Sequence, residues 1–97
     1  MASYVSLLQW TEQGATSFKD TVDRAEAARK AAADMGGSIE LHWTLGEYDM
    51  VAISEFPDDE TATAFLLKVG SLGNVRTQTM RSFDTGEMQQ IISAASR

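Results

Sequence analysis

Gly37–Phe56 reads GSIELHWTLGEYDMVAISEF, and this stretch decides the fold. In residues 39–45 every second side chain is apolar and those between are polar, a period typical of a strand with one buried face. Tyr48–Phe56 is more uniformly apolar, as an interior strand is. Gly46 permits the positive φ that a type II′ turn needs. We therefore predict two strands that fold back on each other about Gly46-Glu47.

A turn at Gly46-Glu47 also fixes the register, because the residue numbers of paired positions then have a constant sum. Trp43 faces Met50 in this register, and His42 and Asp49 share the opposite side of the sheet. Small side chains on the Trp43 side suit close helix packing. We therefore expect the helices on that side and an uncovered face on the His42 side.

The rest of the chain supplies two further strands and three helices. Strands are predicted at Ser3–Trp10 and Asn74–Phe83, which are rich in β-forming residues. Helices are predicted at Thr21–Met35, from Pro57–Glu60 to Gly70, and behind a capping box at Asp84–Glu87. The segment between the first strand and the first helix is expected to be a loop with one helical turn, tucked down by Phe18.

The first long helix is expected to lie close on the sheet through a stripe of small residues: Val22, Ala25, Ala28, Ala32 and Met35. Asp23 and Glu26 have the spacing of a capping box, although Asp20 or Thr21 could cap this helix instead.

The element order β-α-β-β-α-β-α predicts an α+β, ferredoxin-like domain, with its helices on one face of the sheet and one added C-terminal helix. Residues 1–97 form a single domain, since this length supports one modest core. The first strand is apolar on both sides, so the open face would expose much apolar surface. We therefore expect a homodimer or a larger homo-oligomer, of the dimeric α/β-barrel type.

Four segments carry a family resemblance, and together they cover nearly the whole chain: YVSLLQWTEQG, DRAEAARKAAADMGG, WTLGEYDMVAISEFPDDETA and GSLGNVRTQTMRSF. They resemble the GYD domain family of small bacterial proteins, whose Gly-x-Tyr-Asp motif corresponds here to Gly46, Tyr48 and Asp49. The resemblance implies a compact α+β domain similar to the dimeric α/β-barrel group. It implies no particular chemistry.

Composition excludes several partners and sites. The net charge of −6 argues against nucleic acid and against an anionic membrane, since both need a basic patch. The absence of cysteine excludes disulfides, thiolate metal sites and a cysteine nucleophile. No apolar run reaches the roughly 18 residues of a membrane span. We expect a cytoplasmic protein with neither metal nor cofactor.

The candidate catalytic residues are His42 and Asp49, a pair that could accept a proton or anchor a ligand. Each residue also has a structural alternative. An Asp beside a tight turn commonly accepts backbone N–H groups, and a strand histidine commonly lies at a dimer contact.

Four further residues are candidate ligand-binding residues: Tyr4, Trp10, Tyr48 and Arg76. The three aromatic side chains could line a pocket, or they could belong to the core or an interface. Arg76 could hold an anionic ligand by a bidentate contact, or it could form a surface ion pair.

Three functions remain open. The first is a small-molecule-binding module, with its pocket formed at the open sheet face on homo-oligomerisation. The second is a cofactor-independent oxygenase or isomerase of the dimeric α/β-barrel type, an idea that rests on fold analogy. The third is a structural or regulatory assembly subunit without chemistry. We expect a binding role rather than an enzymatic one, and the sequence does not identify the ligand.

Overall fold

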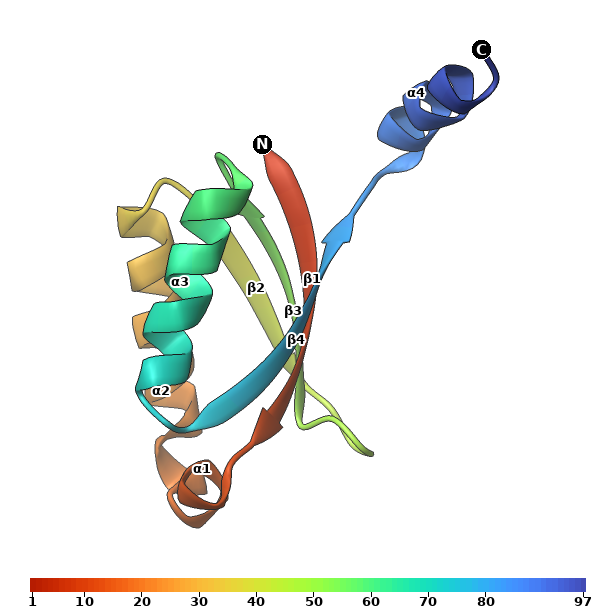
Figure 1. Ribbon diagram of the computed structural model, residues 1–97. Coiled ribbons are helices and arrows are strands. Elements are labelled where there is room, and N and C mark those ends of the chain that lie inside the picture. Colours follow the sequence, from red (N-terminus) through yellow and green to blue (C-terminus); the bar gives the residue numbers. More distant parts are fainter.

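The computed structural model describes all 97 residues as a four-stranded sheet with helices (Figure 1). In chain order the elements are β1 (Ala2–Trp10), α1 (Glu12–Thr16), the 3₁₀ turn η1 (Phe18–Asp20), α2 (Thr21–Asp34), β2 (Ser38–Trp43), β3 (Met50–Phe56), α3 (Asp59–Ser71), β4 (Val75–Ser82) and α4 (Thr85–Ala95). This order confirms the predicted α+β, ferredoxin-like arrangement. The segment predicted as a loop with one helical turn holds the short helix α1 and the turn η1.

The sheet is antiparallel throughout, with strand order β2-β3-β1-β4. Trp43 faces Met50 and His42 faces Val51, so the predicted hairpin register is correct. The strand β2 ends earlier than predicted, at Trp43, and β3 begins later, at Met50, so residues 44–49 form the connecting loop. Gly46 has a φ of 125°, which an L side chain rarely adopts.

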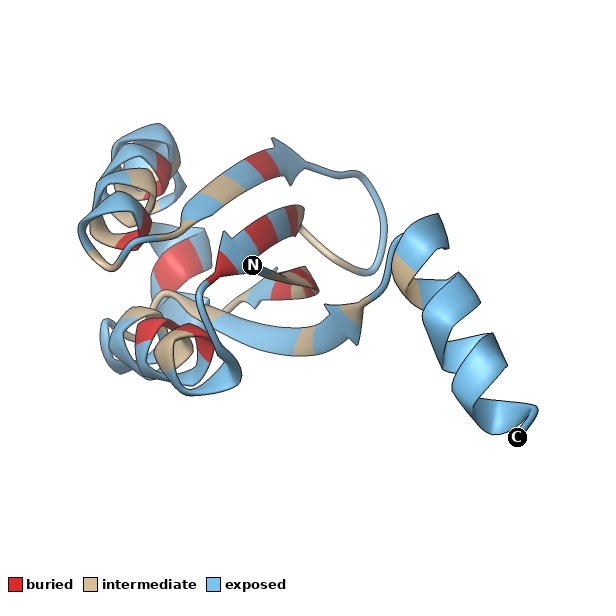
Figure 2. Cartoon of the chain, turned by 90° about the horizontal axis from the view of Figure 1, so that it is seen from above, coloured by how far each residue is buried: buried red, intermediate tan, exposed pale blue.

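The two longest helices, α2 and α3, pack on one face of the sheet, and the core lies beneath them (Figure 2). One cluster lies toward α3 and contains Tyr4, Ala32, Phe56, Ala62 and Phe65. The other lies toward α2 and contains Leu8, Ala25, Leu41, Met50 and Ala52. Because side chains alternate along each strand, this arrangement leaves the other face of the sheet without a helix.

The helix α2 begins at Thr21 as predicted, but Val22, the first residue of the predicted stripe, is not buried. Trp43 Nε1 donates to Thr21 Oγ1 over 3.0 Å, so Thr21 faces β2 and the neighbouring Val22 is 56% exposed. The predicted capping box at Asp23 and Glu26 is not formed. Asp20 occupies the N-cap position without a side-chain hydrogen bond, and Glu26 pairs with Arg29.

Phe18 does not hold down the segment before α2, because its side chain is 54% exposed. Polar contacts do this instead. Arg24 donates to the carbonyl oxygen of Ser17 over 2.9 Å, and Thr11 Oγ1 donates to that of Gly73 over 2.6 Å. The role expected for Phe18 is therefore wrong.

The other two long helices begin as predicted. At the start of α3, Asp58 accepts from the backbone and hydroxyl of Thr61, and these hydrogen bonds hold the pKa of Asp58 below its usual value. At the start of α4, Asp84 and Glu87 form the predicted capping box.

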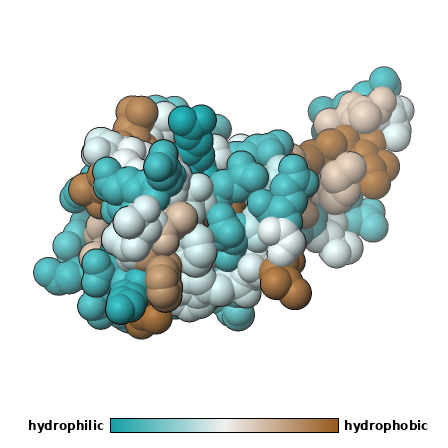
Figure 3. All heavy atoms as spheres, turned by 90° about the horizontal axis from the view of Figure 1, so that it is seen from below, coloured by the Kyte–Doolittle hydropathy of each residue, from teal (hydrophilic) through white to brown (hydrophobic).

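The helix α4 projects from the body, on the side of the sheet opposite α2 and α3 (Figure 1, Figure 2). It makes the molecule long, 52 × 30 × 18 Å, with a radius of gyration of 14.9 Å. A compact domain of this length has a radius of gyration of about 12.5 Å. Its apolar stripe is uncovered, since Met88, Ile91 and Ile92 are 45%, 39% and 52% exposed. Figure 3 shows apolar side chains gathered on this projecting part.

Candidate functional site

The open face of the sheet carries an apolar centre, which we call the open-face cluster: Val5, Leu7, Val51, Ile53 and Met80. Val5 lies between Ile53 and Met80 in the register of the sheet. Ile53 is 51% exposed and Met80 is 41% exposed. The apolar open face predicted from the two apolar sides of β1 is therefore present.

Polar side chains border the open-face cluster at both edges of the sheet. One row across the four strands runs His42, Val51, Leu7 and Gln78. Because neighbouring strands lie about 4.8 Å apart, the two ends of this row are about 14 Å apart. Arg76 lies on the same face as Gln78, two residues earlier on β4.

His42 has a different carboxylate partner from the one predicted. Its Nε2 lies 3.1 Å from Glu40 Oε1 on the same strand, and both side chains are exposed. No hydrogen bond joins His42 to Asp49, although both belong to the hairpin. The joint role of His42 and Asp49 as a proton acceptor stays a prediction. Arg76, the residue predicted to hold an anionic ligand, makes no ion pair in this structure.

Asp49 ties the hairpin loop to the end of β1. Its backbone N–H donates to the carbonyl oxygen of Leu8 over 2.9 Å, and its Oδ2 accepts from the backbone N–H of Trp10 over 2.8 Å. The Asp49 carboxylate thus accepts the Trp10 N–H in place of the backbone carbonyl that a longer β3 would offer. This is the structural alternative that the sequence offers for an Asp beside a turn.

Tyr48 extends the same loop across the open side of the sheet. Its hydroxyl donates to Gln78 Oε1 on β4 over 3.3 Å, and Gln9 Nε2 donates to the carbonyl oxygen of Glu47 over 3.1 Å. The loop therefore crosses β1 and reaches β4. In Figure 1 it extends to the side of the sheet on which α4 lies, at the opposite end of the strands.

Tyr4 and Trp10 lie on the helix side of the sheet, away from Tyr48 and Arg76. Alternation along β1 places both with Leu8, beneath the helices. The four predicted ligand-binding residues are thus divided between the two faces of the sheet. The indole Nε1 of Trp10 is buried without a hydrogen-bond partner.

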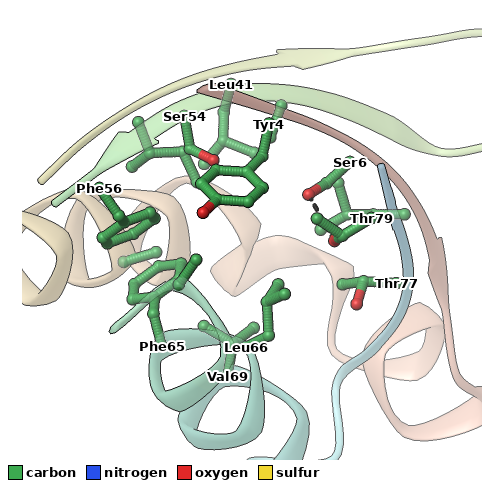
Figure 4. Close-up of a pocket in the computed structure, with 15 residues that line it drawn as sticks. Tyr4, Ser6, Leu41, Ser54, Phe56, Phe65, Leu66, Val69, Thr77 and Thr79 are labelled. Atoms are coloured by element: carbon green, nitrogen blue, oxygen red, sulfur yellow. Dashed lines mark hydrogen bonds between the residues drawn. The ribbon is translucent and has the colours of Figure 1, made fainter. Parts of the chain in front are cut away.

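The Tyr4 side chain forms part of the core. It packs against Phe56, with ring centroids 6.3 Å apart, and its hydroxyl donates to Asp59 Oδ1. Burial raises the pKa of Tyr4 to about 12, with the hydrogen bond to Asp59 as the second cause. Figure 4 shows it beside a hollow of about 50 Å³ that Ser6 and Thr79 also line. This hollow is too small for a ligand larger than a few waters.

A larger hollow, which we call the interhelical cavity, lies between α2 and α3 and has a volume of about 490 Å³. Sequence reasoning missed it. It interprets the alanines of α2 as a surface for close packing on the sheet, and Ala25 and Ala32 do pack that way. Ala25 also lines the cavity, together with Ala28 and Ala31. Two small residues on the side facing another helix are the signal that could have indicated it.

No group of three or more His, Asp or Glu side chains is placed to hold a metal ion. None of the helices has the length and hydropathy to cross a bilayer.

Two solved structures share the fold. One is the crystal structure of TTHA0845 from Thermus thermophilus, with a TM-score of 0.58 and 24% identity over 88% of this chain and 96% of that one. The other is At3g17210 from Arabidopsis thaliana, with a TM-score of 0.58 and 10% identity over the same shares. Likeness at this identity establishes the fold alone. No curated protein matches the chain.

The family comparison is more specific than the structural ones. The GYD domain family matches residues 4–92, a span that begins at the first residues of β1 and ends within α4. It includes Gly46, Tyr48 and Asp49, which shape the loop beside the open face. The chain therefore belongs to the GYD domain family.

Proposed function

We propose that this protein is a small-molecule-binding module that associates with further copies of itself through the open face of its sheet, and that the ligand is held between the copies. The supporting observation is the open-face cluster. Five apolar side chains lie together on a surface that no helix covers, and Ile53 and Met80 are about half exposed. Contiguous apolar surface of this kind marks interaction sites in proteins of this size.

The position of α4 supports association on the same side. The helix lies on the side of the sheet that α2 and α3 leave uncovered, and loop 44–49 flanks the other end (Figure 1). A second copy that covers the open-face cluster would come within reach of the apolar stripe of α4. Two separate uncovered surfaces would then be buried in one event.

The polar border supports a ligand between the copies. His42 and Glu40 stand at one edge of the open face, and Tyr48 with Gln78 stands toward the other. An apolar floor with a few polar groups around it is typical of small-molecule sites. Arg76 has no acidic partner, so its guanidinium is free to bind an anionic group of a ligand.

Sedimentation velocity at micromolar concentration tests the association. We expect the wild-type chain, 10.6 kDa as a monomer, to sediment as a dimer or a larger species. Ile53→Lys places a charge in the open-face cluster and should give monomers. Leu67→Lys is the matched control, because Leu67 is 71% exposed on α3, on the helix side of the molecule. A wild-type protein that stays monomeric contradicts the proposal.

Native mass spectrometry of protein purified from its own host tests the ligand. We expect a small molecule to accompany the oligomer and to be absent from the Ile53→Lys monomer. An oligomer that carries nothing would leave an assembly role and exclude the binding role. A ligand that stays on the monomeric variant would place the site elsewhere in the molecule.

A further inference from the structure

The interhelical cavity has an apolar floor to which every strand contributes one side chain: Leu8 of β1, Leu41 of β2, Met50 of β3 and Val75 of β4. Its walls are Ala28 and Ala31 of α2 on one side and Val69 of α3 on the other. The volume of about 490 Å³ lies in the range of small-molecule sites. The cavity opens on the helix side, so self-association through the open face leaves it free.

The rim of the cavity is basic in an acidic protein. Its charged residues are Arg24, Lys30, Lys68 and Asp34, three bases against one acid, whereas the whole chain has 8 Lys and Arg against 14 Asp and Glu. None of the three bases forms an ion pair. Lys30 on α2 and Lys68 on α3 stand on the two sides of the cavity, while Arg24 is engaged by backbone carbonyls.

We propose that the interhelical cavity binds a small amphipathic carboxylate, with its apolar body on the sheet and its carboxylate between Lys30 and Lys68. The apolar floor favours an alkyl chain or an aromatic ring, because burying apolar surface there removes it from water. The unneutralised lysines select the sign of the head group. This site is separate from the open face and does not depend on the proposed function.

Three probes with one alkyl chain test the head group: octanoate, octan-1-ol and octylamine, titrated into the full-length protein by calorimetry. We expect octanoate to bind most tightly and octylamine most weakly. The affinity should fall about threefold from octanoate to octan-1-ol and again from octan-1-ol to octylamine, since charges near the surface are well screened. Equal affinities, or the reverse order, would overturn the proposal.

Charge reversal at the rim tests the two lysines. Lys30→Glu/Lys68→Glu should reverse the order, so that octylamine binds more tightly than octanoate. Lys19→Glu/Arg97→Glu is the matched control. It changes the net charge equally, at exposed positions outside the cavity, and should preserve the wild-type order. A control that reverses the order as well would show a long-range charge effect and no site.

A filling variant and an NMR map test the location. Ala31→Leu should weaken all three probes about tenfold or more, with a thermal unfolding curve showing that the variant is folded. In the wild-type ¹H–¹⁵N spectrum, octanoate should shift amides of α2 and α3. Shifts confined to the open-face cluster would overturn this site and favour the one between copies. Conversely, a monomeric protein that binds octanoate at α2 and α3 contradicts only the proposed function.

Discussion

Tyr4 combines two environments within one side chain. Its ring belongs to the aromatic core with Phe56, while its hydroxyl reaches Asp59 at the first turn of α3. Arg81 lies over the ring at 5.6 Å from the centroid. Burial and the neighbouring carboxylate both disfavour the phenolate, so the pKa of Tyr4 rises to about 12.

We expect Tyr4→Phe to lower the free energy of unfolding by about 1 kcal/mol at pH 8, because the hydrogen bond to Asp59 is lost. The wild-type advantage should shrink as the pH rises from 10 to 12. In that window the unfolded Tyr4 ionises while the folded one stays neutral, so the wild type loses a contribution to stability that the Phe variant does not have. Urea unfolding at several pH values measures both curves. Parallel curves would contradict the raised pKa.

Among single-residue contacts, the local ones could be predicted from the sequence and the long-range ones could not. The register that joins His42 to Val51 followed from a period of two and one glycine, both of which are local signals. The partner of Asp49 was not local. Trp10 lies 39 positions away, and its contact depends on which strand lies beside β3. Alternation along β1 also could not show whether Tyr4 lies on the helix side or on the open side of the sheet.

Among the elements, the crossing from α2 to β2 is tightly constrained. Gly36 has a φ of 80°, and Gly37 donates its N–H to the carbonyl oxygen of Ala32. A Cβ on Gly37 would stand 2.4 Å from the carbonyl oxygen of Glu55 and 2.5 Å from the ring of Phe56. The helix can therefore enter the strand only through a residue without a side chain.

We expect Gly37→Ala to lower the free energy of unfolding by about 1–3 kcal/mol, because the added methyl group overpacks the site around Phe56. Gly70→Ala is the matched control. Nothing lies within 4 Å of a Cβ there, and alanine favours the helix by up to about 1 kcal/mol. Denaturant unfolding of the two variants should therefore give shifts of opposite sign. Shifts of the same sign would contradict this account of the crossing.

The elements were more predictable than the packing between them. The strands, the long helices and the Asp84–Glu87 capping box all followed from local patterns. The exposure of Phe18 and Val22 did not, because it depends on polar contacts of Arg24 and Trp43 with residues elsewhere. The interhelical cavity depends on the distance between two helices, which no local pattern contains.

At the scale of the whole molecule, α4 is the element that the chain does not use for its own core. Its capping box and an approach of Arg81 to Glu87, 3.7 Å between Nη2 and Oε2, hold its first turn against β4. Beyond that turn the helix contributes an uncovered stripe of Met88, Ile91 and Ile92.

We expect Ile91→Gln/Ile92→Gln to weaken self-association and to leave the unfolding of the body unchanged, since both side chains are exposed in the single chain. Ser93→Gln, on the other side of the same helix, is the control and should associate as the wild type does. Sedimentation across a concentration series measures the difference. Equal association of the two variants would show that α4 takes no part.

The capping box at Asp84 gives α4 a fixed direction of departure from β4. If two copies dock their α4 helices on each other, the assembly closes as a dimer. If each copy docks α4 on the next copy in a head-to-tail manner, the assembly can grow as a filament. A substitution of Asp84 that loosens the first turn of α4 would therefore change which type of assembly forms, as well as the affinity between copies.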